Sequence, residues 1–501
     1  MPESCSGRAP REEEEADQID LASGAAMTPS PPHVDPRPEP KESTELTRNR
    51  LIPLVVLTIV AFAGCGGAAT TAPTNTPAGS QSAAATTSPT QSSGTLTVWL
   101  MNGSLNDNTV VQLDTDFQMA HPGWKVNYQV QQWDGIVDKL TTALASNNPP
   151  DIVEMGNTQA ITFEAADALM DLSSHRADLN GGTSNDSASA DQAYLASLND
   201  ASVYQGKLFA LPFYAGDRVL IYRKDLFSAA GIDASTLTSK DKLIAAATTL
   251  QQKNASVQDF SGLYMAGQNW YALLQMIWDR GGTLATNSNG TWTANLESAQ
   301  SMQGIQDYVD YYKAGSTGPK DNDEMNPPEY DLFHQGKVGM FIGNGWEIGS
   351  AIGTDGKLTA DQVGVMGIPS ATDGKTVPVF LGGSVLGVAA KSQNQAAAID
   401  WLKELTSDSG QQLLISNGWI PSLKSAAADI PDSPSTAILK IQAAEAAAGS
   451  GFTPNDPRWA GVEANNPIKA MLTKILSGQA TIADAAKDAD QKIDAVLNAA
   501  S

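Results

Sequence analysis

Aromatic and hydrogen-bonding side chains occur together in several short stretches of the 501-residue chain. An aromatic face can cover the C–H face of a sugar ring. Amides, carboxylates and guanidinium groups can replace the hydrogen bonds that water makes to its hydroxyls, which are costly to leave unmade. These stretches are therefore candidate ligand contacts, and a neutral sugar is one kind of ligand that such groups suit. The candidates are Asn157, Gln159, Tyr214, Asp217, Arg218, Trp270, Tyr271, Trp346, Glu347, Gly383, Ser384, Arg458 and Trp459.

Some of these candidates follow predicted strands. Asn157 and Gln159 come after an apolar run at residues 151–155, and Trp346 comes after another at residues 338–342. Open α/β sheets bind ligands beyond the carboxyl ends of their strands, so both loops are candidate walls of a binding site. The alternative for Asn157 is that it only caps the helix that follows.

Other candidates also have a structural explanation beside the functional one. Gly383 lets the backbone approach a ligand closely, or it only forms a tight turn. Asp217 and Arg218 follow a bend in the chain, where they contact ligand or form a surface ion pair. Trp459 lies between two predicted helices, where it stacks on ligand or packs against a helix. The residues alone leave these alternatives open.

Composition and missing motifs argue against several other functions. The chain has 31 Lys and Arg against 55 Asp and Glu, a net charge of −24, and no long basic cluster that would hold nucleic-acid phosphates. Its two cysteines and four scattered histidines form no metal-binding pattern. The sequence has no P-loop, no G-x-G-x-x-G and no G-x-S-x-G, so no cofactor and no hydrolase nucleophile are expected.

A glycan-degrading enzyme is the alternative to a protein that binds a sugar without changing it. Such an enzyme needs two carboxylates about 5–10 Å apart beside the scissile bond. The sequence offers Glu154, Asp217 and Glu347 as the carboxylate donors.

Hydrophobic periodicity predicts the elements that would carry these residues. Strands are expected at residues 96–100, 124–130 and 151–155, separated by helices at 107–120 and after Asp134. Strands that alternate with helices over so short a distance indicate a parallel α/β sheet. The later chain is mainly helical, with helices predicted at 240–252, 269–280, 298–314, 328–335, 396–405 and 482–499 and strands at 338–342 and 363–367.

The stretch at residues 204–225, YQGKLFALPFYAGDRVLIYRKD, predicts two strands interrupted at Pro212. Proline cannot donate a ladder hydrogen bond and forces the preceding residue toward extended geometry. Such a strand either crosses between two domains or is an edge strand with a proline bulge inside one domain. The residues of this stretch do not decide between them.

The N-terminal 94 residues are not globular in composition. Residues 1–47 are rich in Pro, Glu and Ser and are predicted to be a disordered leader. Residues 48–65 have the basic flank and short apolar core of a secretory signal, too short for the roughly 20 residues of a membrane span. The signal ends in FAGC, which resembles a bacterial lipobox and predicts lipidation of Cys65; an ordinary signal peptide is the alternative. Residues 66–94 are predicted to be a flexible tether.

From Thr95 onward, the chain resembles family-1 extracellular solute-binding proteins, the substrate receptors of ATP-driven sugar importers, to which maltose-binding protein is distantly related. The resemblance lies in the ordered motifs TLTVW, NNPPDIVEMGNTQ, YQGKLFALPFYAGDRVLIYRKDLFSAAGI, VGVMGIPSATDG and GGSVLGVAAKSQNQAAAIDWLKELTS. It implies an α/β, two-lobe, type 2 periplasmic-binding-protein-like fold with three inter-lobe crossovers. Lobe 1 would comprise residues 95–210 and 370–424, and lobe 2 residues 211–369 and 425–501, with Pro212 and Pro369 at the first two crossovers.

The resemblance also implies a function. A sugar or oligosaccharide would be captured between two hinged lobes and delivered to ABC permease subunits in the membrane. The chain would be a monomer, exported to the outer face of the cytoplasmic membrane or the periplasm, and anchored by lipid on Cys65. A receptor for a glycerol phosphodiester or a polyol is a further alternative, which convergent cations would favour; Arg218 and Arg458 do not decide it.

Overall fold

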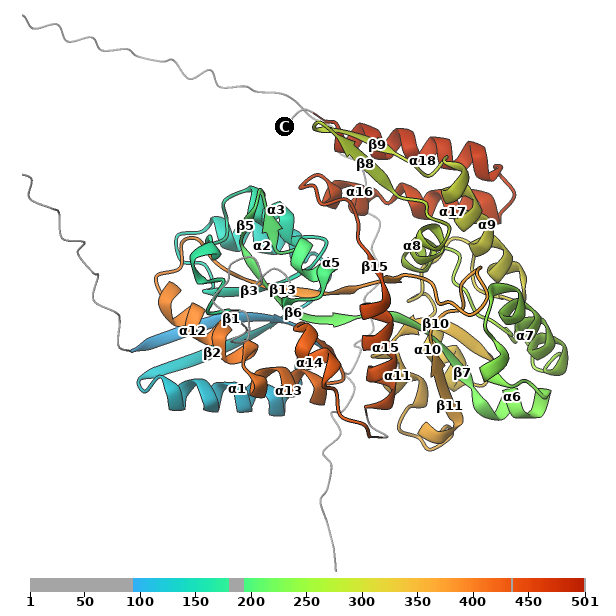
Figure 1. Cartoon of the computed structure of the whole chain (residues 1–501), viewed down its shortest axis with the longest axis horizontal. Coiled ribbons are helices and arrows are strands. Elements are labelled where there is room, and N and C mark those ends of the chain that lie inside the picture. Colours follow the sequence, from blue (N-terminus) through green and yellow to red (C-terminus); the bar gives the residue numbers. More distant parts are fainter. Residues whose placement is uncertain (1–92, 180–192, 434–435, 500–501) are drawn as a thin grey trace, which may run out of the picture. The chain divides into compact units, whose positions relative to one another are not determined.

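The computed structural model describes residues 93–179, 193–433 and 436–499 (Figure 1). All of them belong to one compact unit, Thr86–Ser501. The leader and signal predicted at residues 1–65, and the tether as far as residue 92, lie outside the described residues. In the described part of the chain, no helix has both the length and the apolar character that a membrane span requires.

Six strands form one mixed sheet in the order β14-β6-β13-β3-β1-β2. β1 pairs in parallel with β2 and with β3, whereas β13 runs antiparallel to both β3 and β6. The parallel pairs confirm the α/β pattern predicted from the sequence. The strands are β1 (Gly94–Met101), β2 (Trp124–Gln131), β3 (Ile152–Gly156), β6 (Ala210–Gly216), β13 (Gly382–Val388) and β14 (Ile420–Pro421).

Helices cover both faces of this sheet. Neighbouring residues of a strand point to opposite faces, and both sets of side chains are buried here. Ile152 and Leu386 belong to one buried cluster, and their neighbours Val153 and Val385 belong to another. The first cluster includes residues of α1 (Asp107–Ala120), α12 (Gln395–Thr406) and α13 (Asp408–Ser416), and the second includes residues of α2 (Ile136–Ala145) and α3 (Ala160–Ala165).

A second sheet has three antiparallel strands in the order β10-β7-β11. Its strands are β7 (Arg218–Arg223), β10 (Met340–Asn344) and β11 (Val363–Met366). The helices around it are α6 (Lys224–Ala230), α7 (Lys240–Lys253), α8 (Trp270–Asp279), α9 (Ala299–Lys313), α10 (Glu329–His334), α11 (Glu347–Ile352), α16 (Trp459–Asn465), α17 (Pro467–Leu476) and α18 (Ile482–Leu497). The helices and strands predicted for this region from hydrophobic periodicity are confirmed within a few residues.

Shorter elements connect these layers. Helix α15 (Ala437–Ala448) lies between the two sheets in Figure 1 and contacts β11 and β14. The others are η1 (Ser173–His175), α5 (Ala196–Asp200), β4 (Val203–Tyr204), β5 (Lys207–Leu208), η2 (Ala234–Thr236), β8 (Ala285–Ser288), β9 (Thr291–Ala294), η3 (Ala360–Gln362), β12 (Val379–Phe380), α14 (Lys424–Ala428) and β15 (Ser450–Gly451).

The chain first passes between the sheets at Asp217, the single residue between β6 and β7. Pro212 lies within β6, opposite Val385, where the register of the β6–β13 pair shifts. The stretch therefore does cross between the two sheets, but at Asp217 and not at Pro212, which lies at a bulge inside β6; β6 is not an edge strand, because it pairs with β13 and β14. A bulge is a place where a strand tolerates a residue without an N–H.

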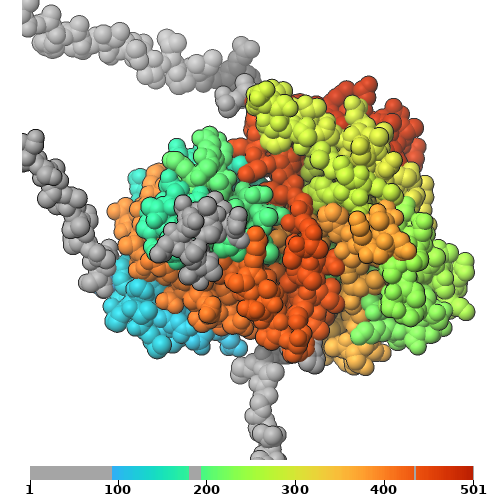
Figure 2. Space-filling model, in the orientation of Figure 1, coloured from blue at the N-terminus to red at the C-terminus, as the bar shows by residue number. Residues whose placement is uncertain are grey.

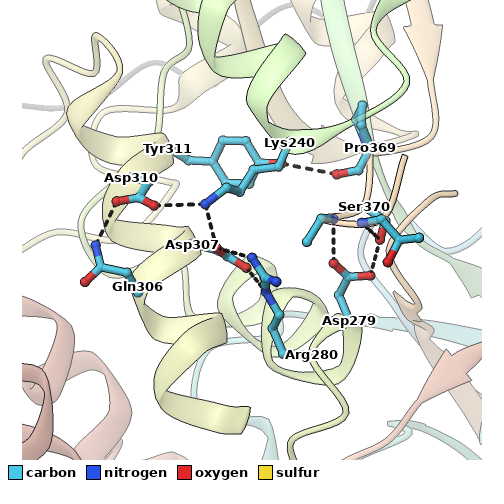
Figure 3. Close-up of polar contacts among 11 residues, drawn as sticks. Lys240, Asp279, Arg280, Gln306, Asp307, Asp310, Tyr311, Pro369 and Ser370 are labelled. Carbon is cyan, nitrogen blue, oxygen red and sulfur yellow. Dashed lines mark hydrogen bonds and ion pairs between the residues drawn. The ribbon is translucent and has the colours of Figure 1, made fainter. Parts of the chain in front are cut away.

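The second passage comes after Pro369. The Tyr311 hydroxyl of α9 donates to the Pro369 carbonyl at 3.2 Å. Asp279, the last residue of α8, accepts hydrogen bonds from the Ser370 hydroxyl at 2.6 Å and the Ala371 N–H at 2.8 Å (Figure 3). These contacts keep the segment with α8 and α9, and the chain enters the six-stranded sheet only at β13.

Asp307 of α9 joins three helices through one carboxylate (Figure 3). It accepts from Lys240 of α7 at 2.7 Å and from Arg280, at the end of α8, at 2.5 Å and 2.8 Å. Lys240 also reaches Asp310 at 2.9 Å. Because the Asp307 side chain is only 6% exposed, this clamp lies largely out of water.

Asp307→Ala should lower the free energy of unfolding by about 3 kcal/mol, because it leaves Arg280 without its carboxylate partner and takes one of two carboxylates from Lys240 in a mostly buried site. Denaturant unfolding measures the change. Asp373→Ala is the control, since it removes a largely exposed pair with Lys242, and it should change stability much less. Similar losses in the two variants would contradict a clamp at Asp307.

Candidate ligand-binding site

A cavity of about 700 Å³ opens where the two sheets meet. Tyr214, Gly383 and Trp419 contribute to its wall from the side of the six-stranded sheet, and Tyr330 and Trp346 from the side of the three-stranded sheet. Aromatic rings thus face the same space from both sheets. The amides that line the cavity are those of Asn102, Asn344 and Gln442.

A second cavity, of about 1050 Å³, adjoins the first. Trp133 and Met325 line both cavities, so the two form one continuous cleft. Trp270, Tyr271 and Gln159 also line the second cavity. The rings of Trp270 and Tyr271 have centroids 4.1 Å apart, and the cleft therefore has aromatic side chains along its whole length.

Tyr214 and Trp419 form a stacked pair in the first cavity. Their ring centroids are 4.3 Å apart and their planes differ by 24°. The Trp419 indole donates to the Ser104 carbonyl at 2.7 Å, and the Tyr214 hydroxyl lies 3.0 Å from the Ser104 hydroxyl. Both rings are thus fixed to the loop that follows β1.

Glu154 of β3 lies behind this pair and is fully buried. Its carboxylate accepts from the Met101 N–H at 2.7 Å and from the hydroxyls of Ser104 at 2.6 Å, Ser384 at 2.5 Å and Tyr214 at 3.2 Å. Burial raises the pKa of Glu154, and the donors act against that rise. One carboxylate therefore ties together β1, β3, β6 and β13 at the edge where the cleft lies.

Trp346 contributes to the opposite wall of the first cavity. Its side chain remains 45% exposed, and it meets Tyr330 edge to face, with ring centroids 5.8 Å apart. Asn344, which also lines this cavity, donates its backbone N–H to Glu347 at 2.8 Å. The start of α11 thus holds the loop that carries Trp346.

Arg218 supports the second cavity without lining it. Its guanidinium lies 4.6 Å from the centre of the Tyr271 ring and donates to Glu324 at 2.8 Å. The Arg218 side chain is only 7% exposed, so it forms a buried ion pair rather than the surface pair considered above. A cation over an aromatic face contributes about 1 kcal/mol or more when it is desolvated, which helps to fix Tyr271.

Asp217 is held by Gln442 of α15, a residue that lines the first cavity. The Gln442 side-chain amide donates to the Asp217 carbonyl at 3.1 Å and to its carboxyl at 2.7 Å. Burial raises the pKa of Asp217 well above its usual range. One side chain thus connects the cavity wall to the residue at which the chain changes sheets.

Comparison with known proteins agrees with this architecture. The sequence pattern of the bacterial extracellular solute-binding protein family matches residues 102–412. The chain belongs to this family. It is similar to the diacetylchitobiose binding protein DasA of Streptomyces coelicolor, with 37% identity over 399 residues that cover 79% of this chain and 88% of DasA.

Solved structures of bacterial binding proteins share the fold of this family member. The GacH receptor of Streptomyces glaucescens aligns with a TM-score of 0.67 at 21% identity, covering 82% of this chain and all (100%) of the receptor. The sugar-binding protein MalE of Xanthomonas citri aligns with a TM-score of 0.67 at 20% identity, covering 81% and 97%. The fold is the two-lobe, type 2 periplasmic-binding-protein fold, with three crossovers between the lobes.

The predicted contact residues of this solute-binding protein divide into two groups. Tyr214, Trp346 and Gly383 line the first cavity, and Gln159, Trp270 and Tyr271 line the second. Their contact with ligand stays a prediction. The candidates that line neither of these two cavities are Asn157, Asp217, Arg218, Glu347, Ser384, Arg458 and Trp459.

The candidates that line neither cavity have other partners. The Asn157 amide donates to the Leu381 carbonyl at 2.9 Å, so it joins β3 to the segment before β13 instead of capping α3. Arg458 forms two hydrogen bonds to Asp456, both 2.7 Å. Trp459 is buried in the core and donates to Glu463 at 2.8 Å, which is the helix-packing alternative.

Several lining residues were not predicted. Trp133 follows β2, as Gln159 follows β3, and both strands end at the same edge of the sheet. Since ligands bind beyond the carboxyl ends of such strands, Trp133 could have been predicted. Trp419 follows Gly418, whose φ of +81° makes the turn into the short β14, and no sequence pattern marks it. Gln442 is one polar residue on a surface helix, and only the tertiary fold brings it to the cleft. In the described part of the chain, no cluster of His, Cys, Asp or Glu could hold a metal ion.

Glu154→Gln should lower the free energy of unfolding by about 1–3 kcal/mol, because the new NH₂ group would face a donor where a carboxylate oxygen now accepts. Urea unfolding at constant pH measures this loss. The fluorescence of Trp419 should change with it, since Ser104 connects the two residues.

Glu164→Gln is the matched control, because Glu164 is buried and neither of its carboxylate oxygens has a partner among the described residues. Burial raises the pKa of Glu164 to about 8. The folded chain therefore holds this proton longer than the unfolded chain, and stability falls as the pH rises from about 4.5 to about 8. Glu164→Gln should remove that fall and cost nothing at low pH. An equal loss in both variants would contradict the role assigned to Glu154.

Proposed function

We propose that this solute-binding protein captures a sugar or oligosaccharide in the cleft and delivers it to the permease of an ATP-driven importer. The observation that carries the proposal is the set of aromatic rings that line the cleft from both sheets: Trp133, Tyr214, Trp419, Tyr330 and Trp346. Such rings cover the C–H faces of sugars. The neighbouring amides supply donors and acceptors for the hydroxyls.

The names of related proteins support a carbohydrate ligand. DasA is named for binding diacetylchitobiose, and the GacH receptor was solved in complex with acarbose. We infer that a short oligosaccharide of amino sugars of the diacetylchitobiose type is the first ligand to test. Micromolar affinity requires about −8 kcal/mol, which several stacked rings and paired hydroxyls can supply.

Closure of the two lobes on the ligand follows from how they are connected. We propose that residues 93–216 and 382–424 form one lobe and that most of the remaining described residues form the other. This moves the predicted first boundary from residue 210 to Asp217. Only this residue separates β6 from β7, and Gln442 holds it from α15, which lies at the surface between the two groups of segments (Figure 2). A ligand that touches both walls favours the closed state through its differential affinity.

A glycan-degrading enzyme fits the site less well. The carboxylates predicted for it, Glu154, Asp217 and Glu347, are at most 1% exposed and line neither cavity of the cleft. A hydrolytic pair must face the scissile bond. Binding without turnover is therefore the better proposal.

A phosphodiester receptor also fits less well. Arg218 and Arg458 are paired with carboxylates and line neither cavity. Lys469 lines the second cavity but lies 3.1 Å from Asp323. Carboxylates from Asp134, Asp138, Asp323, Glu324 and Glu463 line the same cavity. This excess of negative charge disfavours an anionic ligand.

We also propose that the chain acts as a lipid-anchored monomer. The family is extracellular, and the FAGC motif ending at Cys65 supports acylation at the outer face of the cytoplasmic membrane. A single acyl chain binds membranes only reversibly, so stable anchoring needs the several chains of a bacterial lipoprotein. The uncharged residues 66–94 would then separate the binding lobes from the membrane.

Diacetylchitobiose should bind the full chain with micromolar or tighter Kd in titration calorimetry, whereas Trp419→Ala should weaken binding by about 30-fold or more, the usual effect of losing a central aromatic contact. Trp99→Ala is the control, because Trp99 is a half-buried tryptophan that lines neither cavity. It should leave the Kd unchanged. A panel of amino-sugar and glucose oligosaccharides that gives neither heat nor a thermal shift would overturn the proposed function.

Cys65→Ser should move the protein from the membrane fraction to the soluble fraction of the producing bacterium and abolish its labelling by a fatty-acid analogue. Cys5→Ser is the control, because Cys5 is the one other cysteine of the sequence and lies before the predicted signal. Labelling that survives Cys65→Ser would contradict acylation at this residue.

A further inference from the structure

Two buried glutamates lie directly beneath the Tyr330–Trp346 wall of the cleft. Glu329 precedes Tyr330 and is the first residue of α10, and Glu347 follows Trp346 and is the first residue of α11. Each carboxyl group is thus one residue away from an aromatic ring that lines the first cavity. Both residues are 1% exposed.

The hydrogen bonds of this pair are incomplete. One oxygen of Glu347 accepts from the backbone N–H and the side-chain amide of Asn344, at 2.8 Å and 3.0 Å. The other oxygen of Glu347 and both oxygens of Glu329 have no donor among the described residues. Helices α10 and α11 pack together, the rings of Tyr330 and Trp346 beside the two glutamates are in contact, and the carboxyl group of Glu347 acts on that of Glu329. Two carboxylates cannot donate to each other, but a single proton between them would complete a hydrogen bond.

The charges around the pair do not neutralise two anions. Arg218 of β7 acts on both glutamates, but it already pairs with Glu324 at 2.8 Å, and Glu324 adds its own negative charge. If all three carboxylates were ionised, one guanidinium would face three negative charges in a buried site. Two carboxyl groups in such a position cannot both ionise at neutral pH without a large cost.

Tyrosines also surround the pair, and His334 at the other end of α10 lies 3.2 Å from the Ala351 carbonyl of α11 and 3.1 Å from Asp355. Tyr264 and Tyr308 are buried and feel the charge of Glu329. The Tyr308 hydroxyl donates to the Ala266 carbonyl at 2.5 Å, while the Tyr264 hydroxyl has no partner among the described residues. Tyr330 and Asp331 lie on α10 itself, and the charges of Asp331 and Glu347 act on the Tyr330 hydroxyl. The tyrosines and Asp331 bring no further cation to the pair.

We propose that Glu329 and Glu347 share one proton, and that this protonated pair positions the Tyr330–Trp346 wall, so that ligand affinity falls when the proton is lost at higher pH. The part that concerns affinity rests on the proposed function. The glutamates are positioning residues, since they act on ligand only through the aromatic rings beside them.

The direction of the pH effect follows from burial. Burial raises the pKa of Glu329 well above its usual range and raises the pKa of Glu347 in the same direction. The folded protein therefore keeps a proton that the unfolded chain releases near pH 4.5. The stabilisation is complete below that pH and is lost as the pH rises through the folded pKa of the pair.

Loss of the proton would move the wall. Two repelling anions at the starts of α10 and α11 can separate only if one of these short helices shifts or water enters. Either change displaces Tyr330 or Trp346, because each is bonded directly to one of the glutamates. It also disturbs Asn344, which donates to Glu347 and lines the same cavity.

The test compares the full chain with its Glu329→Gln variant from about pH 5 to about pH 9. A glutamine at this position can donate an N–H to Glu347 at every pH, so it keeps the hydrogen bond and removes the titration. For the wild-type chain, the Kd for diacetylchitobiose should rise by about fivefold or more over this range, the lower limit of ordinary coupling between sites. In Glu329→Gln this rise should be absent.

Glu164→Gln is the matched control, because it changes another buried glutamate without hydrogen-bond partners among the described residues. Glu164 lies on α3, beside the six-stranded sheet, and does not line the cleft. This variant should change the stability profile but keep the wild-type dependence of Kd on pH. A wild-type pH dependence in Glu329→Gln, or none in the wild-type chain, would overturn the proposal.

A second readout needs no ligand. The emission of Trp346 is the difference between the spectrum of a chain and that of the same chain carrying Trp346→Phe. This emission should shift with pH when residue 329 is Glu, and it should stay constant when the chain carries Glu329→Gln. If no saccharide binds at any pH, the proposed function fails, and this shift still decides whether the pair positions the wall. An identical shift in the presence and absence of Glu329 would overturn the shared-proton pair even if the sugar binds.

Discussion

The buried carboxylate of Glu154 is the contact on which one wall of the cleft depends. It is placed on β3 but accepts hydrogen bonds from the end of β1, from β6 and β13, and from the loop that carries Ser104. Burying a charge is costly unless donors replace the water it loses. Here the donors come from segments that are distant in the sequence, so the charge is stable only when those segments meet. The same contact fixes Tyr214, and through it the ring of Trp419.

The opposite wall of the cleft also has buried carboxyl groups beneath it, but their hydrogen bonds are not complete. Glu329 and Glu347 are as deeply buried as Glu154, but three of their four oxygens lack a donor among the described residues. One wall therefore rests on a carboxylate whose hydrogen bonds are satisfied, and the other rests on a pair that needs a proton from solvent. Protonation can therefore act on one wall of the cleft without changing the hydrogen bonds that hold the other.

The sequence predicted local structure well because local structure follows from local patterns. The helix at 107–120 and the strands of the parallel sheet can be predicted from the order of apolar residues, because apolar residues recur with a different period in a helix and in a strand. Pro212 misled the prediction because a proline in a strand has the same local effect at a bulge and at a domain crossing. Only the partner strand, which places Val385 opposite it, distinguishes the two. Trp346 was found because it follows a strand, whereas Trp419 and Gln442 reach the cleft through tertiary contacts that no periodicity records.

Asp217 shows why the position of the crossing matters for function. If the chain changed sheets at Pro212, the five residues up to the end of β6 would be a flexible link. Instead β6 continues as a paired strand to Gly216, where it still lies opposite Gly382, and a single residue separates it from β7. This first of the three crossings is therefore short, and few backbone dihedral angles separate the two sheets there. Gln442 binds that residue and also lines the cavity. A ligand that contacts Gln442 would therefore touch a side chain that also holds the first crossing between the sheets.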